Sequence, residues 1–249
     1  MKPIMLAGAA LSLLRVSAFA ADIGVPLSSP LPPLPAIFTW TSCYGGGHAG
    51  GGWGQKDLTD TTGFLAPTTG FSSANLDITG YLIGGQIGCD YQFASNWLIG
   101  IEGTVSGGKI TGTTNIALPA FPGDSATFKE TTDFLMSVTG RVGYAWDRWM
   151  LFGKGGVAWA GDKYSAFDAF STYDFEGLEN RMGWTAGWGV EWAVWQDWSV
   201  RLEYDYYGFG QRNVLFIDNS ISGLAGPENI KQSIQVISLG VNFHVFAGP

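Results

Sequence analysis

The chain is poor in charged residues. Asp, Glu, Lys and Arg make up 14% of its 249 residues, against about 25% in an average soluble protein. Positive charge is the scarcer kind, with 13 Lys and Arg against 21 Asp and Glu, so the formal net charge is −8. A chain of this charge would repel a phosphate backbone, which argues against nucleic acid as a partner. So few charges also cannot coat an ordinary water-soluble globule of this size.

Cysteines and long apolar runs are scarce as well. Two cysteines are too few for the disulfide framework of a small secreted domain. Beyond the first twenty residues no run of about 18 apolar residues occurs, so the sequence predicts no transmembrane helix. The chain is instead rich in hydrophobic residues (46%), aromatic residues (14%), glycine (37 residues) and tryptophan (11 residues). This hydrophobicity argues against intrinsic disorder.

The first twenty residues are typical of a secretory signal peptide. Lys2 supplies a positive start, residues 4–14 are mostly apolar, and residues 18–20 form a small-x-small cleavage motif. We expect cleavage between Ala20 and Ala21, because the apolar stretch is too short to anchor the chain across a bilayer. Residues 21–38 contain five prolines and are predicted to form an extended periplasmic linker.

From about residue 42 onward, large apolar residues alternate with small or polar ones. Trp184, Trp188 and Trp192 share one face of their segment, and glycine, threonine and glutamate occupy the other. A period of two predicts β-strands, and eight such segments occur, at about 42–54, 78–93, 96–110, 132–146, 148–161, 181–195, 198–211 and 233–246. A closed barrel is the β-structure that satisfies every backbone hydrogen bond in lipid. We therefore predict an all-β fold, an antiparallel up-and-down transmembrane barrel over residues 39–249.

The connections between these segments alternate in length. Three are tight turns, at 94–96, 147–148 and 196–197, and four are long, at 55–77, 111–131, 162–180 and 212–232. Outer-membrane barrels place short turns in the periplasm and long loops outside the cell, so we expect localisation in the outer membrane. The predicted loops are acidic in places and would meet antibodies, host surfaces or divalent cations bridging to lipopolysaccharide, although no residue identifies a ligand. These acidic residues are Asp57, Asp60, Asp124, Asp162, Asp168, Asp174, Glu176, Glu179, Asp218 and Glu228.

The aromatic residues gather toward the ends of the predicted strands. Membrane interfaces select two such bands of amphipathic rings. A soluble sandwich would instead bury its rings in a core and would not confine them to strand ends. The band near the short turns comprises Tyr91, Trp97, Trp146, Trp149, Trp195 and Trp198, and the band near the long loops comprises Trp53, Tyr81, Trp159, Trp184 and Phe209.

Charged residues in the strands fall on the face that would line the lumen. Eight strands enclose only enough room for side chains, so we expect these acids and bases to pair and close the lumen. The alternative is a small porin, in which they form a charged constriction for ions or small solutes. The residues are Asp90, Glu102, Arg141, Lys154, Glu191, Arg201, Glu203 and Asp205.

Two histidines also fall on the inward face. His48 and His244 lie on the first and last predicted strands, which are neighbours in a closed barrel. A metal site or a lipid-modifying enzyme is conceivable, but no Ser-His-acid arrangement faces lipid and the two histidines differ in height. We expect a hydrogen-bonding role, no catalytic residues, no metal and no cofactor. The glycine-rich residues 45–52 are not followed by the Gly-Lys-Ser/Thr of a phosphate loop.

Both cysteines lie on the outward face of neighbouring strands. Cys43 and Cys89 fall near the periplasmic ends of the first two strands, and the periplasm is oxidising. Two alternatives follow: a cross-strand disulfide, or two lipid-facing thiols that act as small apolar residues. The geometry of adjacent strands is often poor for the bond.

Several stretches resemble the small outer-membrane immunogenic proteins of alphaproteobacteria. They lie at 39–50, 96–103, 139–147 and 183–191, and residues 201–210 and 239–243 resemble the family's seventh and eighth strands. The resemblance implies a barrel related in shape to the OmpA membrane domain, embedded in outer-membrane lipid, with a structural or surface-antigen role. The family usually has Asn at the position of His48 and often an aromatic residue at that of Cys43. It also ends on an aromatic residue that the barrel-assembly machinery recognises, whereas residues 247–249 follow Phe246 here.

Overall fold

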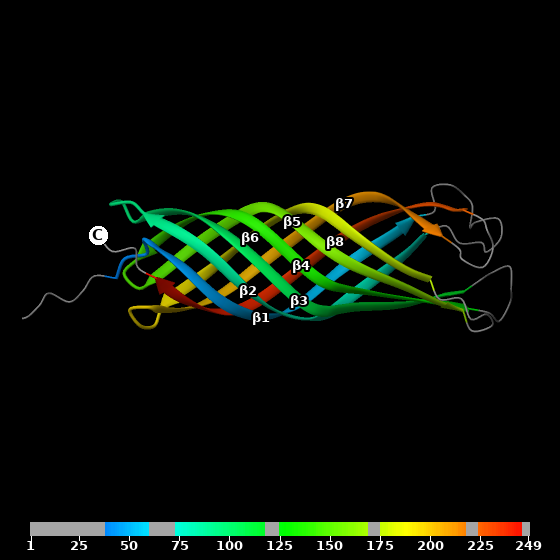
Figure 1. Cartoon of the computed structure of the whole chain (residues 1–249), viewed down its shortest axis with the longest axis horizontal. Coiled ribbons are helices and arrows are strands. Elements are labelled where there is room, and N and C mark those ends of the chain that lie inside the picture. The colour runs from blue at the N-terminus through cyan, green and yellow to red at the C-terminus, as the bar shows by residue number, and fades with distance from the viewer. Residues whose placement is uncertain (1–37, 60–72, 118–124, 169–174, 218–223, 246–249) are drawn as a thin grey trace, which may run out of the picture. The chain divides into compact units, whose positions relative to one another are not determined.

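A computed structural model describes residues 38–59, 73–117, 125–168, 175–217 and 224–245. Neighbouring strands in the sequence are neighbours in space, and β8 pairs with β1, which closes the barrel (Figure 1). The predicted fold, eight antiparallel strands in up-and-down order, is thereby confirmed. The strands are β1 (Ser42–Thr59), β2 (Ser73–Gln92), β3 (Trp97–Ala117), β4 (Ser125–Trp146), β5 (Trp149–Asp168), β6 (Phe175–Ala193), β7 (Trp198–Ile217) and β8 (Leu224–Val245).

The three tight turns lie at one end of the barrel, here called the turn end. Asn96 and Asp147 adopt positive φ angles of 67° and 55° within two of these turns. Asn and Asp tolerate this left-handed conformation better than other residues with side chains. Cys43 opposes Val245 in the β1–β8 register, so the barrel also begins and ends at the turn end. The opposite end is called the loop end.

The strands are longer than the sequence predicted. β4 begins at Ser125 instead of 132, and β8 begins at Leu224 instead of 233. Much of each predicted long loop is therefore strand. About 9–11 residues of tilted strand cross a bilayer, whereas these strands have 18 to 22 residues. Beyond the bilayer both faces of a strand can meet water, so apolar alternation fades while backbone pairing continues.

Four register shifts interrupt the ladder toward the loop end. They lie between Gly107 and Ile110 in the β3–β4 pair, between Thr132 and Phe134 in the β4–β5 pair, and between Gly208 and Gln211 and between Leu215 and Ile217 in the β7–β8 pair. Gly210 has a φ of 64°, a conformation that favours glycine. The prediction that Phe209 joins the outer aromatic band was wrong. Its side chain is 3% exposed, because it continues the inward series of alternate residues on β7.

The predicted signal peptide and the linker up to residue 37 lie outside the described residues, as does Phe246. Residues 37–249 form one compact unit. Within the described residues, no helix is long and apolar enough to cross a membrane.

Candidate functional site

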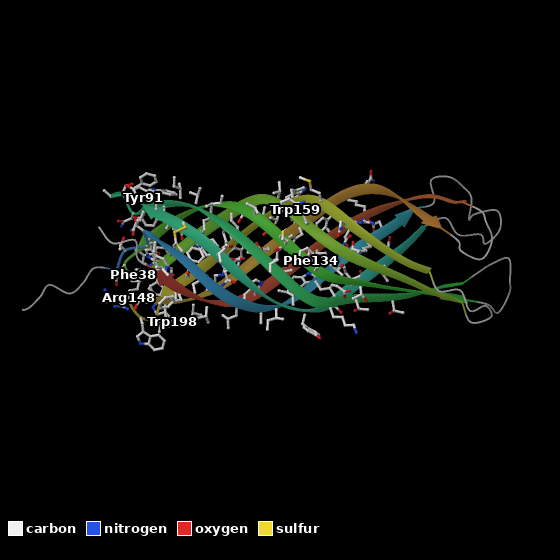
Figure 2. The ribbon with its side chains drawn as sticks, in the orientation of Figure 1. Phe38, Tyr91, Phe134, Arg148, Trp159 and Trp198 are labelled. Carbon is white, nitrogen blue, oxygen red and sulfur yellow. A yellow bond between two sulfur atoms is a disulfide. The ribbon has the colours of Figure 1, made fainter. Side chains whose placement is uncertain are left out.

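The lumen is filled by side chains in layers, and the first layer closes the turn end. It comprises Phe38, Trp40, Leu98, Ala145, Met150, Phe152 and Ala193. Trp40 precedes β1 and is fully buried. Its backbone N–H donates to Gln92 Oε1 at 3.0 Å, and its indole N–H donates to the Asp147 carbonyl at 3.3 Å. The described residues before β1 thus cover the turn end of the lumen. Figure 2 shows Phe38 at this end. Sequence reasoning missed this layer because residues 38–41 precede the alternating pattern.

The predicted lumen charges lie together in the second layer, and each is at most 7% exposed. Arg141 is one centre of this layer. Its Nη2 donates to Glu191 Oε2 at 2.9 Å, and its Nη1 lies 3.4 Å from Asp90 Oδ2 and 3.6 Å from Glu102 Oε2. The guanidinium carbon lies 4.1 Å from the centre of the Phe152 ring. Arg141 on β4 is therefore linked to β2, β3, β5 and β6 by ion pairs, a hydrogen bond and a ring contact.

Glu102 is the second centre of the polar layer. It accepts hydrogen bonds from Arg201, from Lys154 Nζ at 3.2 Å and from the Tyr44 hydroxyl at 2.7 Å. Lys154 also binds Glu203, and its Nζ lies 3.2 Å from Asp205 Oδ1. Tyr44 was not predicted as a lumen residue, although it shares the inward face of β1 with His48.

The two histidines belong to the same polar layer. His48 makes hydrogen bonds to Gln86 Oε1 at 2.6 Å and Ser106 Oγ at 2.7 Å. In the β1–β8 register Tyr44 opposes His244, whereas His48 opposes Gly240. The four-residue offset separates the histidines by about 13 Å along the strand. Within the described residues no group of three or more His, Cys, Asp or Glu is arranged to hold a metal ion.

His244 stands between a serine and an acid. Its Nδ1 lies 2.9 Å from Ser42 Oγ, and its Nε2 lies 2.8 Å from Ser199 Oγ and 3.6 Å from Glu191 Oε1. These residue types are those of a Ser-His-acid hydrolase. However, Ser42 is 3% exposed, and the ring centre of Trp40 lies 5.9 Å from that of His244. A substrate could reach this serine from the turn end only by displacing the first layer.

A third layer, apolar again, follows toward the loop end. It is formed by Leu76, Ile78, Leu82, Ile110, Leu135, Ala158, Ala160, Tyr207, Phe209, Ile234 and Val236. Between it and the polar layer lies a cavity of about 10 Å³, bordered by His48, Glu203 and Asp205 among others. A cavity of this size holds about one water molecule.

A second group of buried charges lies against the loop-end part of this apolar layer, with Lys56 opposite Leu76 and Arg181 opposite Ala160 in the strand registers. It corrects the prediction for Asp162. This residue was expected in an outer loop, but it lies on β5 and is 1% exposed. Its Oδ1 accepts from Thr132 at 2.6 Å, and its Oδ2 lies 3.5 Å from both Lys56 Nζ and Arg181 Nε. Extending the inward alternation of the first predicted segment by two residues would have found Lys56, and Arg181 already shares the inward face of the predicted segment 181–195.

The other predicted loop acids divide between strands and undescribed segments. Asp57 is exposed on β1. Asp168, Glu176, Glu179 and Glu228 also fall within strands, and Asp60, Asp124, Asp174 and Asp218 lie outside the described residues.

The predicted interface aromatics lie on the outer face. Trp53, Tyr81, Tyr91, Trp97, Trp146, Trp149, Trp184, Trp195 and Trp198 are 38% to 67% exposed, and Trp159 is half-buried. Figure 2 shows Tyr91 and Trp198 at the turn end and Trp159 farther along the barrel. On β6, however, Trp188 and Trp192 are exposed as well. On this strand exposed tryptophans therefore recur at every fourth residue, with Ala186 and Val190 between them, instead of lying only at the two ends.

Cys43 and Cys89 oppose each other directly in the β1–β2 register and are joined by a disulfide. Both positions are exposed on the outer face near the turn end. The bond connects the first two strands at the end where the barrel closes on β8.

A closed barrel with polar side chains inside, an apolar face outside and rings at its interfaces is the architecture of an outer-membrane β-barrel. The chain belongs to the outer membrane protein beta-barrel domain family, whose model matches residues 8–244. It is 31% identical over 260 residues to the 31 kDa outer-membrane immunogenic protein of Brucella melitensis, covering 98% of this chain and 99% of that protein. The 25 kDa outer-membrane immunogenic protein of Brucella abortus is 25% identical, covering 94% and 97%.

Among solved structures, the outer membrane protease OmpT of Escherichia coli superposes with a TM-score of 0.53 and 10% sequence identity. The match covers 84% of this chain and 98% of that one. At this identity the likeness concerns the fold alone. The family and the relatives place this protein in the outer membrane, as the sequence predicted.

Proposed function

We propose that this protein is a sealed outer-membrane barrel with a structural and surface-antigen role and no catalytic activity. Its turn end faces the periplasm and its loop end faces outward. The observation that carries the proposal is the filling of the lumen from Trp40 to Asp162 by two apolar layers and two groups of buried charges. A permeant ion would have to break several buried ion pairs and cross two apolar layers, both of which are costly.

The competing function is a small porin, which would need a continuous water-filled path. Liposome swelling distinguishes the two. Proteoliposomes with the full chain are placed in an isotonic solution of a small sugar or a potassium salt. We expect the swelling rate of protein-free vesicles, whereas rapid swelling would favour a porin. A conducting porin reconstituted at the same protein-to-lipid ratio is the positive control.

The second competing class is a lipid-modifying enzyme, and the Ser42–His244–Glu191 arrangement is its best candidate site. Burial beneath Phe38 and Trp40 argues against it, because catalysis requires a substrate-accessible nucleophile. Mass profiles of lipid A from cells with and without the protein test this. We expect identical profiles, and new or missing acyl species that depend on Ser42 would support the enzyme.

We also propose that the barrel-assembly machinery inserts the chain, and that any antibody or host ligand would bind the connections at the loop end. Both follow from membership of the family and from the proposed orientation.

A further inference from the structure

The outer face of β2–β4 carries an apolar groove. Its volume is about 490 Å³, and its outward-facing lining consists of Gly85, Ile87, Gly103, Val105, Met136 and Val138. Gly85 and Gly103 form the floor, and the larger side chains form the walls. Over much of the outer face, by contrast, large apolar side chains stand outward.

The barrel's own packing does not require glycine on the groove floor. A Cβ on Gly85 would meet its nearest neighbour, the Gly46 carbonyl oxygen, at 3.4 Å, and a Cβ on Gly103 would meet nothing nearer than 4.0 Å. At the inward Gly100 on the same strand, a Cβ would lie 2.7 Å from the Cys89 carbonyl oxygen. The inward glycine is imposed by close strand approach, whereas the floor glycines leave an open depression on the lipid side.

On β2 the groove residues Gly85 and Ile87 lie between the exposed Tyr81 and Tyr91, in the part of the outer face that meets lipid. A positive charge lies nearer the loop end. Going toward the loop end, the outward residues of β3 are Gly103, Val105, Gly107 and then Lys109. Four residues of strand place Lys109 about 13 Å beyond Val105. Lys109 opposes Tyr81 in the β2–β3 register, and Tyr81 is 64% exposed. Lysine beside an exposed aromatic residue is the usual composition of a membrane interface, where the ammonium reaches toward anionic headgroups.

The charge and the groove are arranged like the two parts of one lipid. A phosphate paired with Lys109 would lie at the height of the exposed Tyr81, and an acyl chain attached to it would extend along β3 into the groove between Val105 and Met136. With the loop end facing outward, as proposed above, this height corresponds to the outer leaflet. We propose that Lys109 and the β2–β4 groove bind one phosphorylated lipid of that leaflet, the lipid A of lipopolysaccharide. This site depends on the proposed orientation but not on the closure of the lumen.

Native mass spectrometry of the full-length protein, released from detergent after incubation with purified lipid A, tests the proposal. Gly103→Leu fills the groove, and Lys109→Gln removes the charge. The matched controls are Gly140→Leu, at an outward glycine where a Cβ meets nothing within 4 Å, and Lys231→Gln, at an exposed lysine on β8. Heat-modifiable gel migration establishes that each variant is folded, and Lys109→Gln changes only an exposed side chain.

We expect the wild type and both controls to retain one lipid A, and each test variant to lose about fivefold in apparent affinity. Equal retention by all five proteins would overturn the proposal. Phosphatidylglycerol competing as well as lipid A would overturn the assignment to lipid A, because any anionic lipid would then suffice. The measurement is made in detergent and is independent of conductance, so its failure would leave the sealed-lumen proposal standing.

Discussion

The two faces of the same strands obey different constraints. On β3, inward Glu102 has four partners at defined distances, whereas outward Ile101 and Val105 are 59% and 45% exposed and face lipid. On the inner face each charged residue needs its particular partner, because an unpaired buried charge is costly. On the outer face any of several apolar residues would serve at most positions, since many of them suit lipid equally well. Substitutions on the two faces should therefore differ strongly in effect.

The largest expected effect is at Arg141. Arg141→Ala leaves Glu191, Asp90 and Glu102 without their shared cation and should lower the free energy of unfolding by about 3–5 kcal/mol. Urea unfolding of the protein reconstituted in lipid vesicles measures this. Lys231→Ala, on the outer face, should stay within about 0.5 kcal/mol of the wild type. Equal midpoints for the two variants would contradict the contrast between the faces.

The disulfide is the place on the outer face where we expect substitutions to lower stability strongly. Replacing both Cys43 and Cys89 by alanine removes a cross-link over 46 residues and should cost about 2–4 kcal/mol. The same unfolding assay applies. Intact mass after alkylation, with and without prior reduction, tests the bond itself. Two thiols that alkylate freely without reduction would exclude it.

We expect a smaller difference in stability between substitutions at two glycines of β3. Gly100→Val forces a side chain against the β2 backbone and should cost about 1–3 kcal/mol. Gly103→Val points into the open groove and should change stability by no more than about 0.5 kcal/mol. Comparing the two unfolding midpoints checks the assignment of faces, and a more damaging Gly103→Val would reverse it.

The sequence was sufficient to predict the barrel, because alternation, tight turns and the absence of apolar helices all report local physical constraints. It also placed the lumen charges on one face, since the period of two carries through each strand. The partners of Arg141 could not be predicted, because pairing in the lumen depends on registers between strands that no local pattern fixes.

The predictions were least accurate where the membrane no longer shapes composition. Beyond the bilayer, β4 and β8 continue without apolar alternation, so their outer halves were predicted as loop and Asp162 was placed outside. Trp40 was missed for a related reason. A residue that plugs the barrel from a segment outside any strand leaves no periodic signal.

Single-channel recording in planar bilayers tests the sealed lumen most directly. Wild-type protein, inserted and verified as folded by heat-modifiable migration, should produce no steady openings over a wide range of voltage and salt. Glu102→Gln keeps the shape of the central acid while removing its charge, and it identifies the path of any current that does appear. Steady wild-type openings whose ion selectivity shifts in Glu102→Gln would show that ions pass the charged layer and would contradict a closed lumen.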